Sequence, residues 1–123
     1  MAHESILVVD DQPASTKLIQ SILAGEGYQV LVAANATEAL QALQNSMPDL
    51  ILMDIHLPGL DGSALMRLLK SHPESRHIKI VAISAYASKE DDERIISAGC
   101  DGFIPKPVDT RTLAASIREY FDK

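Results

Sequence analysis

Three carboxylates, a hydroxyl and an ammonium group follow short apolar runs of this sequence. The run ILVV is followed by Asp10 and Asp11, and the run LILM is followed by Asp54. Ser84 follows the run IVAI, and Lys106 comes after GFI. If these runs are parallel strands of one sheet, their carboxyl ends lie at the same edge. We therefore expect these five groups to converge there.

Such an acidic cluster needs charge compensation. Two carboxylates about 4 Å apart repel by roughly 4 kcal/mol at an effective dielectric constant near 20, so three must share a proton or bind a cation. Oxygen ligands with room left for water favour Mg²⁺, with Mn²⁺ as the alternative ion. Mg²⁺ beside Lys106 and Ser84, with Asp54 as an oxygen nucleophile, is equipped to move a phosphoryl group onto a carboxylate.

Each of these residues also has an ordinary structural interpretation. Asp10 or Asp11 can cap a helix before Pro13, Asp54 can start a turn, and a lone lysine is most often a solvated surface charge. Their joint placement after four of the five apolar runs favours the chemical interpretation.

The apolar runs and the segments between them predict the fold. Runs at 6–9, 30–33, 50–53, 80–83 and 102–104 predict five buried strands, and the segments that follow have the apolar spacing of helices. The order βαβαβαβαβα predicts an α/β fold, a single doubly wound (βα)5 domain with helices on both faces of a parallel sheet. The second run ends in alanines, which favours a marginal strand and the order 2-1-3-4-5. Expected helix caps are Asn35, Asp61, Ser88 and Asp109 near starts and Gly27 and Gly99 near ends.

Length and composition restrict the function further. The chain has 123 residues, 46% of them hydrophobic, with a net charge of −6 and a pI of about 5.0. No apolar run approaches the ~18 residues of a membrane span, and no signal-peptide pattern opens the chain, so we expect a cytoplasmic protein with no membrane partner. The absence of a basic run argues against direct nucleic-acid binding. Cys100, the single cysteine, is expected to be a reduced packing residue.

Four motifs carry a resemblance to a known family. ILVVDD, PDLILMDIHLPGLDG, IVAISAYA and AGCDGFIPKP stand in order along the chain and closely resemble the receiver domain of two-component response regulators, a flavodoxin-like, CheY-like fold. The sequence looks most like stand-alone receivers. The resemblance implies a phosphoacceptor switch of a phosphorelay, phosphorylated in a Mg²⁺-dependent reaction by a histidine kinase or histidine phosphotransfer protein. It implies no enzyme activity beyond self-phosphotransfer and autodephosphorylation.

The resemblance also implies a role for each site residue. Asp54 matches the phosphoacceptor, Asp11 matches a direct metal ligand, and Asp10 matches a ligand that acts through water. His56 matches the position whose backbone carbonyl binds the metal, and Lys106 matches the lysine that pairs with the phosphoryl group.

The resemblance further implies a switch, in which the hydroxyl of Ser84 turns toward the phosphoryl group and Phe103 rotates into the space left. The bond before Pro107 is a candidate cis peptide, against a base rate of about 5%. His56 and Tyr86 are expected to flank the phosphoryl group and limit the entry of water, which predicts a phosphoryl lifetime of minutes or longer.

Partners are expected on two surfaces. The fourth helix, the fifth strand and the fifth helix would form the face that changes its binding of a downstream protein target. Exposed positions of the first helix would select the phosphodonor: Ala14, Lys17, Leu18 and Ser21. We expect a monomer or a weak dimer that depends on phosphorylation.

Residues 1–123 are expected to form a receiver domain without an output domain. The main alternatives are a receiver module cut from a larger hybrid kinase or regulator, and a dehalogenase-like Mg²⁺-dependent phosphatase. The phosphatase motif needs a second Asp two residues after the nucleophile, where this chain has His56. A flavodoxin-like electron carrier would need a phosphate-binding loop where this chain has DDQPAS, and a purely structural interaction domain would leave the acidic cluster without a purpose.

Overall fold

The computed structural model describes residues 4–54, 62–84, 100–105 and 108–122. Within them, five strands form one parallel sheet in the order β2-β1-β3-β4-β5, as the sequence predicts. The strands are β1 (Ser5–Val9), β2 (Gln29–Ala33), β3 (Leu50–Asp54), β4 (Lys79–Ser84) and β5 (Gly102–Pro105). The helices are α1 (Pro13–Gly25), α2 (Ala36–Asn45), α3 (Gly62–Ser71) and α5 (Leu113–Asp122). The expected fourth helix and the expected caps Asp61, Ser88 and Gly99 lie outside the described residues.

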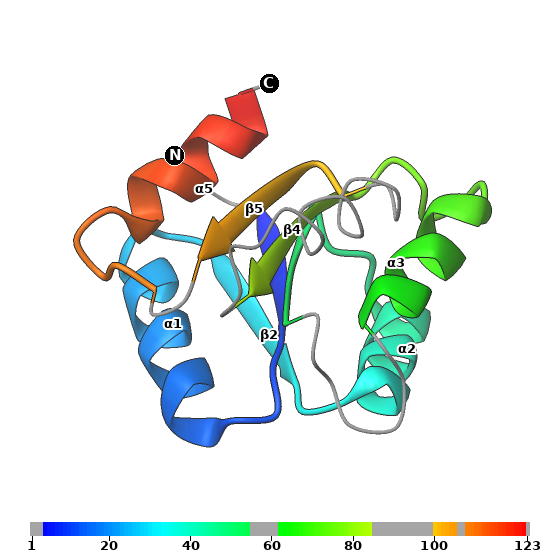
Figure 1. Ribbon diagram of the computed structural model, residues 1–123, viewed down its shortest axis with the longest axis horizontal. Helices are drawn as coiled ribbons and strands as arrows, with labels where there is room; N and C mark the ends of the chain where they lie inside the picture. The colour runs from blue at the N-terminus through cyan, green and yellow to red at the C-terminus, as the bar shows by residue number, and fades with distance from the viewer. Residues whose placement is uncertain (1–3, 55–61, 85–99, 106–107, 123) are drawn as a thin grey trace.

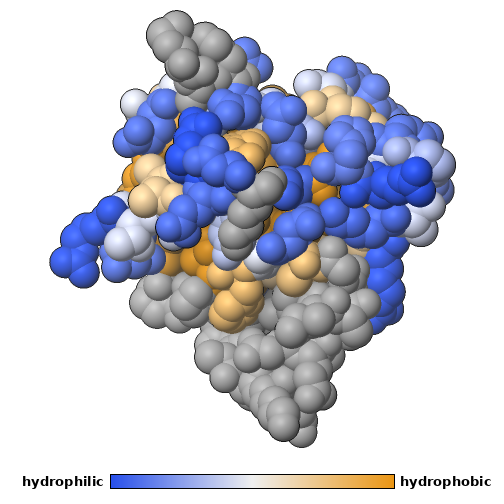
Figure 2. Space-filling view, turned by 90° about the horizontal axis from the view of Figure 1, so that it is seen from above, coloured by the Kyte–Doolittle hydropathy of each residue, from blue (hydrophilic) through white to orange (hydrophobic). Residues whose placement is uncertain are grey.

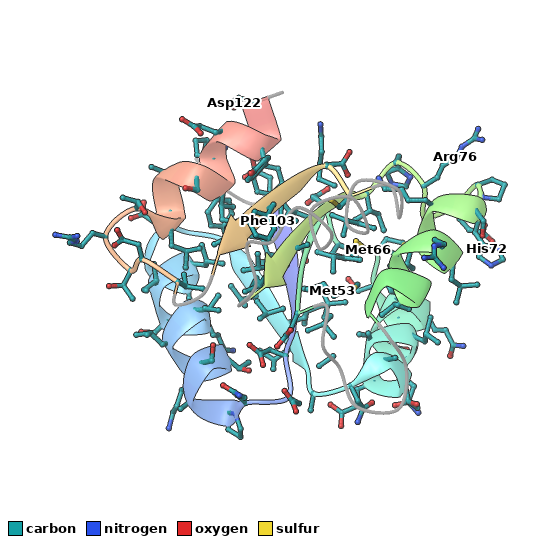
Figure 3. All side chains as sticks on the ribbon, viewed as in Figure 1. Met53, Met66, His72, Arg76, Phe103 and Asp122 are labelled. Atoms are coloured by element: carbon teal, nitrogen blue, oxygen red, sulfur yellow. The ribbon has the colours of Figure 1, made fainter. Side chains whose placement is uncertain are left out.

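The helices cover both faces of the sheet (Figure 1). α1 and α5 pack on one face, where Ile19, Leu23, Leu113 and Ile117 join the core. α2 and α3 pack on the other face, where Figure 3 labels Met53 of β3 and Met66 of α3 in the second core. All five residues of β3 are buried, because this central strand has neighbours on both edges and helices on both faces.

The strands extend one residue beyond the predicted runs at several ends, including Ser5, Gln29, Asp54 and Pro105. A strand is defined by backbone pairing, whereas the apolar run marks only where burial requires hydrophobic side chains. Asp54 is the informative case. It lies within β3, paired with Ile83 of β4, rather than in the loop after the strand.

Local capping explains where the helices begin and end. Asn35 accepts a hydrogen bond from the backbone N–H of Glu38, and the Glu38 carboxylate accepts one from the N–H of Ala34, the residue before the cap, in a variant of the capping box. α1 ends before Gly27, whose φ of 95° lies in the left-handed region that favours glycine. Both positions confirm the predicted caps.

Polar contacts fasten the amino-terminal edge of the sheet. Seen from above, this edge exposes mainly hydrophilic residues (Figure 2). Lys70 of α3 forms an ion pair of 2.9 Å with Asp101, and Asp101 also accepts a hydrogen bond from the N–H of Ile80. Arg118 of α5 pairs with Glu4 at 3.0 Å and lies over the ring of Tyr28. These contacts therefore lie at the opposite edge of the sheet from the acidic residues.

Tyr120 of α5 covers the outer edge of β5. Its hydroxyl accepts a hydrogen bond from the N–H of Phe103 (3.2 Å) and lies 3.4 Å from the carbonyl oxygen of Phe103. A Cβ atom added at Gly102 would collide with the Tyr120 ring. The tyrosine therefore satisfies backbone groups that an edge strand would otherwise expose, and glycine leaves room for it.

We expect Gly102→Ala to lower the free energy of unfolding by about 1–2 kcal/mol, because the displaced Tyr120 ring loses its hydrogen bond to Phe103. Gly25→Ala is the matched control. A Cβ atom at Gly25 meets nothing within 4 Å, and alanine favours the last turn of α1, so this change should stabilise by about 0.5 kcal/mol. Urea unfolding followed by circular dichroism gives both values. Equal effects of the two substitutions would contradict this account of Tyr120.

Candidate metal centre

The strand register brings the acidic residues together. β1 and β3 pair with Val9 opposite Met53, so the residues that follow these two, Asp10 and Asp54, reach the same level of the sheet. The N–H of Asp10 donates to the carbonyl oxygen of Ala33 (3.0 Å), which fixes the chain at the end of β1. The site thus lies at the carboxyl edge of the adjacent strands β1 and β3.

Three carboxylates meet at this edge, as the sequence predicts. One carboxylate oxygen from each of Asp10, Asp11 and Asp54 lies within 4.8 Å of the other two. Asp10 and Asp54 are 2% and 3% exposed, whereas Asp11 is open to solvent. Two nearly buried carboxylates this close together repel in a region of low dielectric constant, which favours a bound cation.

The surroundings of Asp10 fit a metal ion. Its Oδ1 accepts a hydrogen bond from the N–H of Gln12 (3.0 Å). Its Oδ2 is buried and has no hydrogen-bond partner among the residues that the structure describes. A buried carboxylate oxygen left in this state is costly, and a hard cation with oxygen ligands would satisfy it. Asp10, Asp11 and Asp54 can therefore hold a divalent cation of the Mg²⁺ type.

Other predicted site residues are described only in part. Ser84 is the last residue of β4, one position beyond the level of Asp54, and Pro105 lies opposite it on β5. Phe103 of β5 is partly buried and packs against the core on the α2 and α3 side of the sheet (Figure 3). The positions His56, Tyr86, Lys106 and Pro107 lie outside the described residues.

Sequence reasoning missed two residues that fix the acidic loop. The N–H of Gln12 binds the Asp10 carboxylate, and Thr16 of α1 is buried beside it. Thr16 shares the buried stripe of α1 with Ile19 and Leu23. A threonine within an apolar helical stripe was the available signal, because a buried hydroxyl needs a hydrogen-bond acceptor.

A groove of about 300 Å³ adjoins the carboxylates, between α1 and the edge strand β2. Besides Asp10 and Asp11 it is lined by Pro13, Thr16, Lys17, Gln20, Val32 and Ala34. The four α1 residues expected to meet the phosphodonor are all exposed: Ala14, Lys17, Leu18 and Ser21. Of these four, Lys17 also lines the groove.

The surroundings of Cys100 agree with the expected packing role. It is partly buried and packs against the core on the α2 and α3 side of the sheet. Burial, with the negative charge of Asp101, raises the pKa of its thiol, so little reactive thiolate is present at neutral pH.

The chain belongs to the response regulator receiver domain family of two-component signalling. The sequence model of this family matches residues 6–118. Among its relatives is the polar-differentiation response regulator DivK of Brucella anthropi, which is 37% identical over 117 residues, with 95% of each chain covered.

Solved receiver structures agree with this assignment. A CheY-like receiver domain protein from Methanospirillum hungatei JF-1 is 37% identical and superposes with a TM-score of 0.88, covering 98% of this chain and 95% of the other. The receiver domain of a sensor histidine kinase from Pseudomonas aeruginosa PAO1 is 30% identical with a TM-score of 0.88, covering 99% of this chain and all of the other. That structure holds a magnesium ion in its active-site cleft.

The family and the acidic cluster together assign this chain a phosphoacceptor signalling role. They give no support to the dehalogenase-like phosphatase. Among the described helices, none combines the length and apolar character that crossing a bilayer requires.

Proposed function

We propose that residues 1–123 work as one receiver domain that takes a phosphoryl group onto Asp54 from a phosphohistidine of a kinase or phosphotransfer protein. The observation that carries this proposal is the convergence of Asp10, Asp11 and the buried Asp54, where Oδ2 of Asp10 has no hydrogen-bond partner among the described residues. The receiver family supplies the class of reaction.

The chemistry assigns each atom a task. An Asp54 carboxylate oxygen attacks the phosphorus, the O–P bond forms as the P–N bond of the phosphohistidine breaks, and the imidazole nitrogen keeps the electron pair and takes a proton from solvent. Mg²⁺ held by Asp10, Asp11, Asp54 and the carbonyl of His56 would neutralise charge on the transferring group, and Mn²⁺ would serve the same purpose. Attack by water on the resulting acyl phosphate returns Asp54 and releases inorganic phosphate.

Residues around the acceptor complete the proposal. Lys106 pairs with the phosphoryl group, Ser84 turns toward it, and Phe103 rotates into the space left. The face formed by the fourth helix, β5 and α5 then changes its affinity for a downstream target. His56 and Tyr86 restrict the water that would attack the acyl phosphate.

Intact-mass spectrometry tests the reaction itself. After incubation with acetyl phosphate and Mg²⁺ the protein should gain the mass of one phosphoryl group, and chelation of the metal with EDTA should prevent the gain. A protein that gains nothing with Mg²⁺, or gains as much without it, would contradict the proposed function.

Asp10→Asn should abolish the stabilisation that Mg²⁺ gives to the folded protein. For the wild type, Mg²⁺ at ten times its dissociation constant should raise the free energy of unfolding by about 1.4 kcal/mol. The variant should gain almost nothing, and without metal it should be at least as stable as the wild type because one of the repelling charges is gone.

Urea unfolding with and without Mg²⁺ measures these differences. Asp122→Asn is the matched control, because it removes the same charge from the far end of α5 (Figure 3), away from the acidic residues. The control should keep the full response to Mg²⁺. An equal loss of response in both variants would show that the cation acts on overall charge rather than at this site.

A further inference from the structure

Thr16 is one of four polar or charged residues that are buried in the described part of the chain, together with Asp10, Asp54 and Ser75. It is 5% exposed and lies one turn into α1, next to the loop that carries the acidic residues. Its hydroxyl needs an acceptor there, because polar groups that are almost fully buried are hydrogen-bonded in native structures.

The hydroxyl of Thr16 contacts the backbone of that loop. It donates to the carbonyl oxygen of Gln12 at 2.9 Å and lies 3.4 Å from the carbonyl oxygen of Asp10. The backbone N–H of Thr16 also donates to Gln12, at 3.0 Å. Thr16 therefore makes three contacts with two residues of the loop, more than the helix backbone alone would provide.

These contacts continue to the metal ligand. The N–H of Gln12 holds Oδ1 of Asp10, and the N–H of Asp10 is held by Ala33 of β2. With its backbone and one carboxylate oxygen fixed, Asp10 presents Oδ2 as the buried oxygen with no hydrogen-bond partner among the described residues. The orientation of Asp10 depends on the position of Gln12, which Thr16 fixes.

We propose that Thr16 is a positioning residue of the cation site, whose hydroxyl holds the Asp10–Gln12 turn so that Asp10 directs Oδ2 toward the cation. This inference rests on the proposed function, since it assumes that the three carboxylates bind Mg²⁺. Partners one shell away from a metal commonly change its affinity 10- to 100-fold when they are removed.

Thr16→Val tests the hydroxyl alone, because valine keeps the shape and the β-branch of threonine. Titration calorimetry with MgCl₂ should give a dissociation constant raised about tenfold, whereas Thr16→Ser, which keeps the hydroxyl, should stay within about twofold of the wild type. Urea unfolding without metal identifies any variant that is not folded, and Thr16→Ala serves as a second hydroxyl-free variant.

Ser75→Ala is the matched control for the loss of a buried hydroxyl. Ser75 donates to the carbonyl oxygen of Leu69 at 2.6 Å, after α3 and away from the acidic residues. This variant should lose stability and keep the Mg²⁺ affinity of the wild type. If Ser75→Ala also binds Mg²⁺ more weakly, the loss of affinity reflects lower stability in general, and the proposal is wrong.

Two further outcomes are distinguishable. If the wild type binds Mg²⁺ and Thr16→Val binds it equally well, the role of Thr16 is wrong while the proposed function stands. If the wild type itself binds no Mg²⁺, the cation site fails and both proposals fall with it.

Discussion

Asp54→Asn should abolish phosphoryl uptake from acetyl phosphate, with a loss of more than about 100-fold in the rate of phosphorylation. The asparagine side chain has no anionic oxygen to attack phosphorus, and the substitution also removes one carboxylate ligand of the proposed cation site. Asp54 is 3% exposed at the end of the most buried strand, so a substitution of nearly the same shape should leave the fold intact. Intact mass recorded over time measures the rate.

Asp49→Asn is the control for this prediction. Asp49 is exposed and directly precedes β3, at the opposite end of the strand from Asp54, where its carboxylate accepts a hydrogen bond from the N–H of Ser5 at 2.8 Å. Asparagine can still accept that bond through its carbonyl oxygen. The control should be phosphorylated at the wild-type rate. Uptake that persists in Asp54→Asn would mean that another side chain is the acceptor.

Leu52→Ala should lower the free energy of unfolding by about 3 kcal/mol, a large share of the stability of a domain of this size. Leu52 is fully buried in the centre of β3, between Val8 of β1 and Val81 of β4. The removed side chain leaves a cavity in the core shared with α1 and α5, and close packing there prevents full collapse.

The same substitution at an exposed position isolates the effect of burial. Leu18 of α1 is 50% exposed, and alanine is an equally good helix former, so Leu18→Ala should change stability by no more than about 0.5 kcal/mol. Urea unfolding of both variants gives the comparison. A loss below about 1 kcal/mol for Leu52→Ala would contradict the packing of β3 described above.

The order of the strands and the place of the acidic residues followed from local patterns in the sequence. Apolar runs alternating with helical spacing allow little except a parallel sheet, and such a sheet brings the ends of β1 and β3 to one edge. That edge collects Asp10, Asp11 and Asp54. Asn35 and Gly27 were predictable as caps because capping depends on a few neighbouring residues.

Contacts between distant or irregular segments were not predictable in this way. The hydroxyl of Tyr120 meets the backbone of Phe103 only because α5 folds back along the outer edge of β5. The contacts of Thr16 with Gln12 and Asp10 depend on the path of a three-residue loop, which no periodicity encodes. Sequence patterns thus predicted which acidic residues meet at the carboxyl edge of the sheet, whereas the hydrogen bonds that orient Asp10 follow from the three-dimensional path of the loop.

The most direct test of the central claim is to locate the phosphoryl group. The protein is phosphorylated with acetyl phosphate and Mg²⁺ and then reduced with borohydride, which converts an aspartyl phosphate into homoserine. Peptide mass spectrometry then reads the modified position. The account predicts homoserine at position 54 and at no other aspartate. Homoserine at Asp10 or Asp11, or phosphate retained on a histidine, would contradict it.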